Sequence, residues 1–170
     1  MIDLSATEFT YLGELLNSLD VSLVEITEQI EGAGNRDIDH LYEKAEYFIG
    51  AGFCSMQRCL FAVLQDKDIE AAEARALGPT STGGIPVAQL VHAAANYWKH
   101  SPEWHIWQLE LSSHSQRTVD KMLNGRESSH YPLADLLFDL CNDKSLLLSH
   151  CVPYLEEWRS AVYKRLEKTV

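Results

Sequence analysis

Six side chains within a short stretch are the part of the sequence best equipped for chemistry. They comprise two imidazoles, an amide, an ammonium, a carboxylate and an indole: His92, Asn96, Lys99, His100, Glu103 and Trp104. Three of the four tryptophans also lie in this part of the chain, and tryptophan favours half-buried positions with a polar contact. Hydrogen-bond donors beside aromatic rings could line a pocket or stack on a base. We therefore treat this stretch as the candidate site.

Helical geometry decides which of these side chains can meet. A helix over 86–100 would bury an apolar stripe made of Val87, Leu90, Val91, Ala94 and Trp98. At about 100° per residue, His92, Asn96 and Lys99 fall on the opposite side. His100 lies beside them. Three interpretations stay open: a solvated polar face, the wall of a site, or a cap in which Asn96 or His100 bonds backbone groups near Ser101-Pro102.

The spacing of the histidines does not favour a shared metal ion. His92, Asn96 and His100 are separated by four residues each, so the outer two lie about 12 Å apart along a helix axis. A chelate would need His105 or acids from another helix. The paired Glu-x-x-His motifs of di-iron helical bundles are missing from the sequence. We expect no metal and no other cofactor.

Nucleophilic catalysis has little support in the sequence. There is no G-x-S-x-G motif. No two of the four cysteines have the C-x-x-C spacing of a zinc or redox site. Cys54, Cys59, Cys141 and Cys151 all lie among apolar residues, which disfavours the thiolate form. We expect four free thiols, buried as small apolar side chains in a reducing, cytoplasmic compartment.

The recurrence of apolar residues every three or four positions predicts an all-α chain. The clearest run is Phe9, Leu12, Leu16, Leu19, Leu23, Ile26 and Ile30, which predicts a long helix near 5–31. A second helix near 36–65 would pair with it as an antiparallel hairpin. Shorter helices are expected near 68–77, 86–100, 102–111, 115–124, from Pro132, near 143–151 and over 153–168. We expect one domain over 1–170, a helical bundle without strands.

Small residues and polar clusters add two local expectations. Gly50 and Gly52 lie inside the second helix, where the lack of side chains would let another helix approach closely. The cluster from Ser112 to Ser115 precedes the helix near 115–124 and is typical of a helix N-cap. Both features predict packing and helix ends more directly than they predict chemistry.

Charge is unevenly distributed. The net charge is −11, and residues 1–35 contain seven acids and no Lys or Arg. A broad nucleic-acid or anionic-membrane surface needs clustered basic residues, so any nucleic-acid contact would use the second half. No apolar run of about 18 residues predicts a membrane span, and the N-terminus lacks the basic and apolar regions of a signal peptide.

Two patches resemble a known pattern. The run Ala95 to His100 followed by Glu103-Trp104, in one-letter code ANYWKHxxEW, is similar to a motif of bacterial helical proteins, and 46–53 with Gln57 looks like part of the same pattern. The arrangement more distantly resembles the HEPN group of helical bundles. That resemblance implies a bundle fold and, in many members, metal-independent RNase activity. The Arg of the active pattern would stand at Ala95, so only Asn96 and His100 match it.

Three functions follow as hypotheses, the last of them a metal site built on the histidines discussed above. The first is a non-catalytic module that binds a protein partner or a second copy of itself, because an amphipathic stripe and an acidic exterior suit such contacts. The second is a HEPN-like RNase or nucleotide-binding protein of a toxin or phage-defence system that uses Asn96, Lys99 and His100. Metal-free RNA cleavage needs an acid or base and a cation near the phosphate, although consecutive helical residues such as Lys99 and His100 point about 100° apart.

Overall fold

The computed structural model describes residues 4–34, 37–104, 111–123, 125–127, 130–142 and 144–168. Its elements are helices: α1 (Leu4–Gly32), α2 (Asp39–Leu64), α3 (Ala71–Arg75), α4 (Val87–His100), the 3₁₀ turn η1 (Ser101–Glu103), α5 (Ser113–Leu123), α6 (Pro132–Leu140), the 3₁₀ turn η2 (Leu148–Cys151) and α7 (Val152–Glu167). No strand occurs within these ranges. The predicted all-α fold is confirmed.

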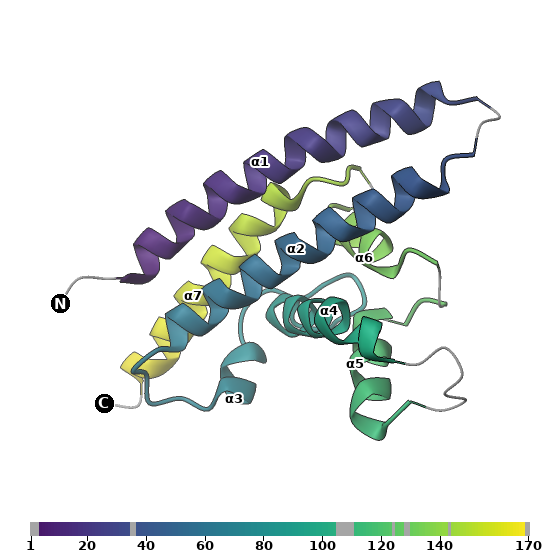
Figure 1. Ribbon diagram of the computed structural model, residues 1–170. Helices are drawn as coiled ribbons and strands as arrows, with labels where there is room; N and C mark the ends of the chain where they lie inside the picture. The colour runs from purple at the N-terminus through teal and green to yellow at the C-terminus, as the bar shows by residue number, and fades with distance from the viewer. Residues whose placement is uncertain are drawn as a thin grey trace.

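The two longest helices form the predicted antiparallel hairpin (Figure 1). The 3-4 stripe of α1 faces inward, and its buried members are Phe9, Leu12, Leu16, Leu23 and Ile26. Gly34 follows the helix with a positive φ of 61°, a backbone conformation that costs glycine little. Helix periodicity in the sequence therefore predicted both the extent and the buried face of α1.

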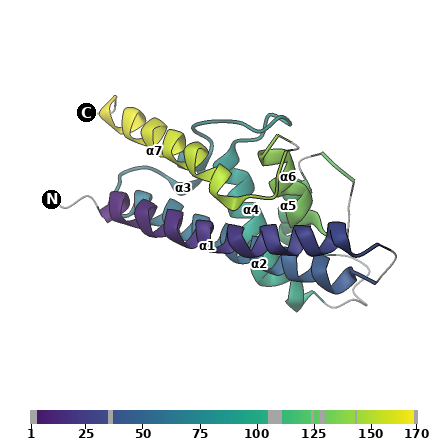
Figure 2. The ribbon, with the colours of Figure 1, turned by 90° about the horizontal axis from the view of Figure 1, so that it is seen from above.

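Helix α2 is the centre of the bundle. It contacts α1, α4 and α6, and α4 crosses the hairpin steeply, being seen nearly end-on in Figure 1 and side-on in Figure 2. Within the described residues α2 alone is long and apolar enough to cross a membrane, but half of its most apolar window is buried inside the bundle. Such burial is typical of a helix in the core of a bundle.

Glycines on α2 set the distance to its neighbours. A Cβ atom built on Gly50 would lie 1.9 Å from Cδ1 of Trp98 on α4, and one on Gly52 would lie 2.6 Å from Cδ1 of Leu148 in η2. Side chains at either position would collide with these groups. The expectation that small residues allow close helix packing is confirmed.

A buried carboxylate holds η2 against α1. Asp20 is 7% exposed, and its two oxygens accept hydrogen bonds from the backbone N–H groups of Leu148 at 2.6 Å and Ser149 at 3.0 Å. The helix predicted over 143–151 is wrong for 144–147, which are not helical, and residue 143 lies outside the described residues. The donors that Asp20 binds are those of a short turn feeding directly into α7.

A second carboxylate caps α6. Glu46 on α2 accepts hydrogen bonds from the N–H groups of Leu133 at 2.8 Å and Ala134 at 2.9 Å. Burial raises the pKa of Glu46 to about 7, with the nearby charge of Asp135 acting in the same direction and the two hydrogen bonds opposing it. Glu46 thus ties α2 to α6 through a group that titrates near neutral pH.

The helix predicted over 102–111 is also wrong where it can be compared. The helical backbone ends at Glu103, and Trp104 is extended with φ −82° and ψ 109°. Residues 105–110, which include His105, lie outside the described residues. The helix predicted over 68–77 is shorter than expected, because Glu70 is still extended and α3 begins at Ala71.

Candidate functional site

The six candidate side chains divide between two sides of α4. His92, Asn96 and Lys99 face Gln57 of α2. His100, Glu103 and Trp104 line a pocket against α5, and Asn96 lines it as well. Asn96 is therefore the one predicted residue shared by both arrangements.

A hydrogen-bond network joins α2 to α4 around Gln57, a side chain only 3% exposed. Lys99 Nζ donates to Gln57 Oε1 at 2.7 Å, and Gln57 Nε2 donates to Asn96 Oδ1 at 3.0 Å. Gln57 Nε2 lies 2.9 Å from His92 Nδ1, and Asn96 Nδ2 lies 3.1 Å from His92 Nε2. A neutral imidazole has one N–H and one lone pair, so it accepts from only one of these two amides.

His92 is held in its neutral form. Burial lowers its pKa to about 4, and the positive charges of Arg75, Lys99 and Lys121 act in the same direction. The ring also meets Phe61 of α2 edge to face, with 6.0 Å between centroids. The group therefore serves in hydrogen bonding at neutral pH and carries no charge there.

The interpretation as a solvated face is wrong for His92 and Asn96, because both side chains are partly buried against α2. It agrees with the exposure of Lys99 and His100. The cap interpretation also fails for Asn96 and His100. Asn96 bonds side chains, and His100 Nδ1 lies 3.4 Å from a Glu103 carboxylate oxygen. Gln57 was absent from the predicted site, although a polar residue inside the apolar stripe of the 36–65 helix was a signal for it.

A pocket of about 310 Å³ lies between the end of α4, η1 and the start of α5. We call it the corner pocket, and its lining residues are Asn96, His100, Glu103, Trp104, His114, Ser115 and Thr118. The three α5 residues were not predicted as site residues. Their polar cluster was interpreted as an N-cap, and that function is confirmed because Ser112 Oγ accepts a hydrogen bond from the Ser115 N–H at 3.1 Å.

Of the described aromatic residues, Trp104 lines the corner pocket, and two ring pairs involve it or the end of α4. Tyr97 and Trp104 meet edge to face with centroids 5.6 Å apart. Next along α4, Trp98 meets Tyr47 of α2 in the same manner at 5.4 Å, and Tyr47 is 62% exposed. We call these four residues the aromatic corner. It presents ring surface to solvent directly beside hydrogen-bonding groups.

The four cysteines are free, as predicted. Burial raises the pKa of each thiol, to about 12 for Cys59. For Cys54 the neighbouring Lys99 charge only partly opposes this effect. A raised pKa disfavours the thiolate that a nucleophile needs, so none of these thiols is activated.

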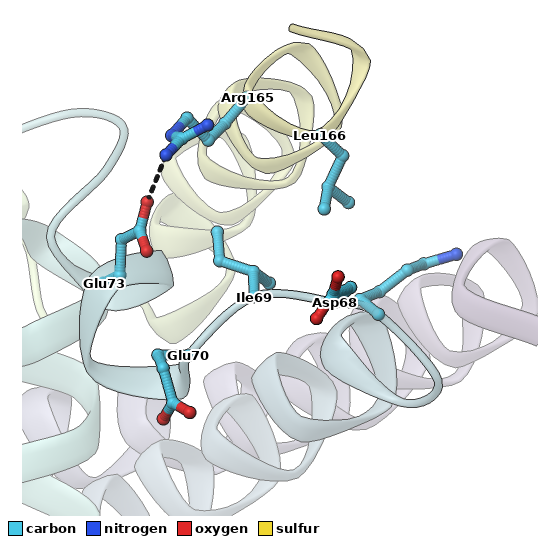
Figure 3. Close-up of a pocket in the computed structure, with 7 residues that line it drawn as sticks. Asp68, Ile69, Glu70, Glu73, Arg165 and Leu166 are labelled. Carbon is cyan, nitrogen blue, oxygen red and sulfur yellow. Dashed lines mark ion pairs between the residues drawn. The ribbon is translucent and has the colours of Figure 1, made fainter. Parts of the chain in front are cut away.

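Among the described residues, two cavities larger than the corner pocket lie outside it. One, of about 650 Å³, runs along α2, and its lining residues are Glu8, Cys54, Gln57, Arg58, Phe61, Ala62, Leu64, Gln65, Ala71 and Lys99. We call it the α2 groove. The other, of about 380 Å³, lies between the α2–α3 connection and the end of α7, where Arg165 pairs with Glu73 at 2.9 Å (Figure 3). The described residues contain no group of three or more His, Cys, Asp or Glu side chains that could hold a metal ion.

Comparisons of the chain with family models, with curated proteins and with solved structures return no significant match. The HEPN-like resemblance of the 95–104 segment therefore stays a prediction.

Proposed function

We propose that this protein is a non-catalytic interaction module that self-associates through the aromatic corner and the corner pocket. The observation that carries the proposal is the placement of half-exposed aromatic rings beside a pocket of hydrogen-bonding groups. Tyrosine and tryptophan dominate the energetics of protein interfaces when they are surrounded by polar groups that exclude water. Trp104 is the central anchor of this surface.

The charge distribution favours a second copy as the partner. Helix α1 carries six acids and no Lys or Arg, whereas residues 87–123 carry three basic and three acidic residues. Helix α1 also lies across α2 from α4 and α5 (Figure 1). Two copies that meet at the corner therefore bring together surfaces without net charge and keep the acidic helices apart. Closed two-fold association uses the same patch on both copies.

The proposal is tested by size-exclusion chromatography with light scattering over a range of protein concentrations. We expect a mass of twice 19.2 kDa for the wild type and a shift toward one copy for Trp104→Ala. Tyr11→Ala is the matched control, because Tyr11 is an aromatic residue that is 62% exposed on α1. A wild type that stays at one copy throughout the range contradicts the proposal.

A cytoplasmic location and a bacterial source belong to the same proposal. The four free thiols support a reducing compartment, and the resemblance of the 95–104 segment supports the source. Alkylation of thiols in intact cells, read by mass spectrometry under denaturing conditions, would detect any oxidised pair. Persistent disulfides in those cells would contradict the location.

One observation favours RNase activity as the second candidate. His100 and His114 line the same pocket, and two imidazoles can supply the base and the acid of metal-free RNA cleavage. Ala95 stands where the HEPN pattern has Arg and is fully buried, so no cation occupies that position. Lys99 does not replace it, because it lines the α2 groove on another side of α4.

The RNase candidate is tested by incubating purified protein with single-stranded RNA in the presence of a chelator. Cleavage that disappears in both His100→Ala and His114→Ala would support it. Intact RNA with the wild type, or cleavage unchanged by either substitution, would remove it. Self-association is measured as molar mass and RNase activity as RNA cleavage. Each candidate function can therefore fail independently of the other.

A further inference from the structure

The α2 groove has the size and chemistry of a small-molecule site distinct from the corner. Its volume of about 650 Å³ lies inside the range of known ligand pockets. Cys54, Gln57, Phe61 and Leu64 recur at helical spacing along its floor, and Ala71 of α3 and Lys99 of α4 stand at its sides. With Glu8 of α1, four helices contribute to one concave surface.

One end of the groove presents a fixed cation. Lys99 Nζ is held by the oxygen of Gln57 at 2.7 Å, and Gln57 is fixed in turn by its contacts with His92 and Asn96. An ammonium has three N–H donors, so two remain for a ligand. Within the described residues no carboxylate forms an ion pair with Lys99.

Part of the groove is apolar, although Glu8, Arg58 and Gln65 also line it. The Phe61 ring is 49% exposed, yet its orientation is defined by edge contact with the His92 ring. Leu64 and Ala71 continue the apolar wall. A hydrocarbon or aromatic body lying on Phe61 would remove this surface from water, which is favourable.

The charges in the groove favour a negatively charged ligand. Glu8 and Arg58 pair with each other at 3.2 Å, and their charges cancel at the rim. His92 is neutral at physiological pH because burial lowers its pKa. Lys99 therefore leaves the groove with a single positive charge in a protein of net charge −11. A single ammonium balances the charge of a monoanion, whereas a phosphate monoester carries a charge of about −2 at neutral pH.

We propose that the α2 groove binds a small monocarboxylic acid with an apolar body, its carboxylate on Lys99 and its body on Phe61. The proposal goes beyond self-association, since Lys99 and Phe61 do not belong to the corner pocket. It assigns to Gln57 a positioning function: Gln57 holds the ammonium and does not itself need to touch the ligand.

The probe for this proposal is phenylbutyrate, titrated into the full-length protein by isothermal calorimetry. The uncharged phenylbutyramide has the same body and is the matched ligand. We expect saturable binding of the acid and binding of the amide that is weaker by about tenfold to a hundredfold, the usual effect of one charged hydrogen bond.

Two variants locate the site. Lys99→Met removes the ammonium but keeps an unbranched side chain of four heavy atoms, and it should reduce affinity for the acid to that of the amide. Lys121→Met is the matched control, because Lys121 Nζ also donates to a glutamine oxygen, that of Gln89 at 2.9 Å, but outside the groove. It should leave both affinities unchanged. Far-UV circular dichroism confirms that each variant is folded.

Three results would overturn the proposal: no saturable binding of the acid up to about 10 mM, far weaker than functional affinities; equal affinity for acid and amide; or unchanged affinity in Lys99→Met. If Lys99→Met does not fold, Phe61→Ala replaces it and should weaken acid and amide alike. Equal wild-type and Phe61→Ala affinities then contradict the proposal. None of these readouts depends on the oligomeric mass.

Discussion

At the scale of single residues, Gln57 connects more of the candidate site than any residue that the sequence pattern selected. Its amide reaches His92 and Asn96 on α4, and its oxygen receives Lys99. A buried polar group is tolerated only when it is paired. The same contacts that satisfy Gln57 therefore fix the register of α4 on α2 and aim Lys99 into the α2 groove.

Replacing Gln57 by leucine should destabilise the fold by about 1–3 kcal/mol, because His92 and Asn96 would lose their partner while still partly buried. Urea unfolding followed by circular dichroism measures the change. Gln116→Leu, on the exposed side of α5, should change stability by less than about 0.5 kcal/mol. Equal effects of the two substitutions would mean that the network contributes nothing specific.

Acid should weaken the fold through His92. Its pKa in the fold is about 4 against an ordinary value of 6.5, so between these values the unfolded chain binds a proton that the folded chain does not. The stability owed to neutral His92 is present above pH 6.5 and lost as pH falls to 4. The difference in unfolding free energy between the wild type and His92→Gln should shrink over that interval. A constant difference would contradict a neutral His92.

At the scale of elements, the sequence predicted helices well and turns poorly. The periodic runs in α1 and α2 exceed six turns each, so many residues agree on which face of each helix is buried. Gly50 correctly indicated close packing. Residues 102–104 and 144–147 lack such runs. The turn that follows 144–147 is held by Asp20 of α1, a distant partner that no local pattern reveals.

The candidate site, like the fold, was predicted only in part from the sequence. Spacing along one helix placed Asn96 and His100 near each other, and both line the corner pocket. The contributions of Gln57 from α2 and His114 from α5 depend on how separate helices pack. The resemblance grouped Gln57 with the 95–104 segment, but spacing along one helix cannot show that Gln57 and His114 lie beside α4.

The contact between α2 and α4 should fail when Gly50 gains a side chain. Gly50→Ala puts a methyl group onto the Trp98 ring, and overpacking of this kind costs about 1–3 kcal/mol. Gly13→Ala is the control, since nothing lies within 4 Å of its Cβ position on α1, and it should stabilise the helix by about 0.5–1 kcal/mol. Thermal unfolding compares them. A Gly50→Ala protein as stable as the wild type would contradict the close packing.

The contact between α2 and α6 should depend on pH through Glu46. Its pKa is raised from 4.5 to about 7 in the fold, so the folded chain holds a proton that the unfolded chain releases. The stability owed to protonated Glu46 is present below pH 4.5 and lost as pH rises through 7. The wild type should therefore lose stability relative to Glu46→Gln across this interval, as measured by urea unfolding. A wild type that gains stability relative to Glu46→Gln as pH rises would contradict a raised pKa of Glu46.

At the scale of the whole molecule, the acidic helix and the corner pocket lie on different sides of α2. Helix α1 runs along one side of α2, and helices α4 and α5 lie on the other (Figure 1). Helix α1 carries six acids and no Lys or Arg, whereas α4 and α5 together carry three basic residues and one acid. This separation allows two copies of a protein with net charge −11 to meet without strong repulsion.

Hydrogen–deuterium exchange at low and high protein concentration tests self-association through the corner most directly, because it locates the surface as well as detecting it. Slower exchange at high concentration is predicted for 96–104 and 113–118, with 4–32 unchanged. Exchange that is independent of concentration in 96–104 and 113–118, or protection confined to α1, would contradict the account.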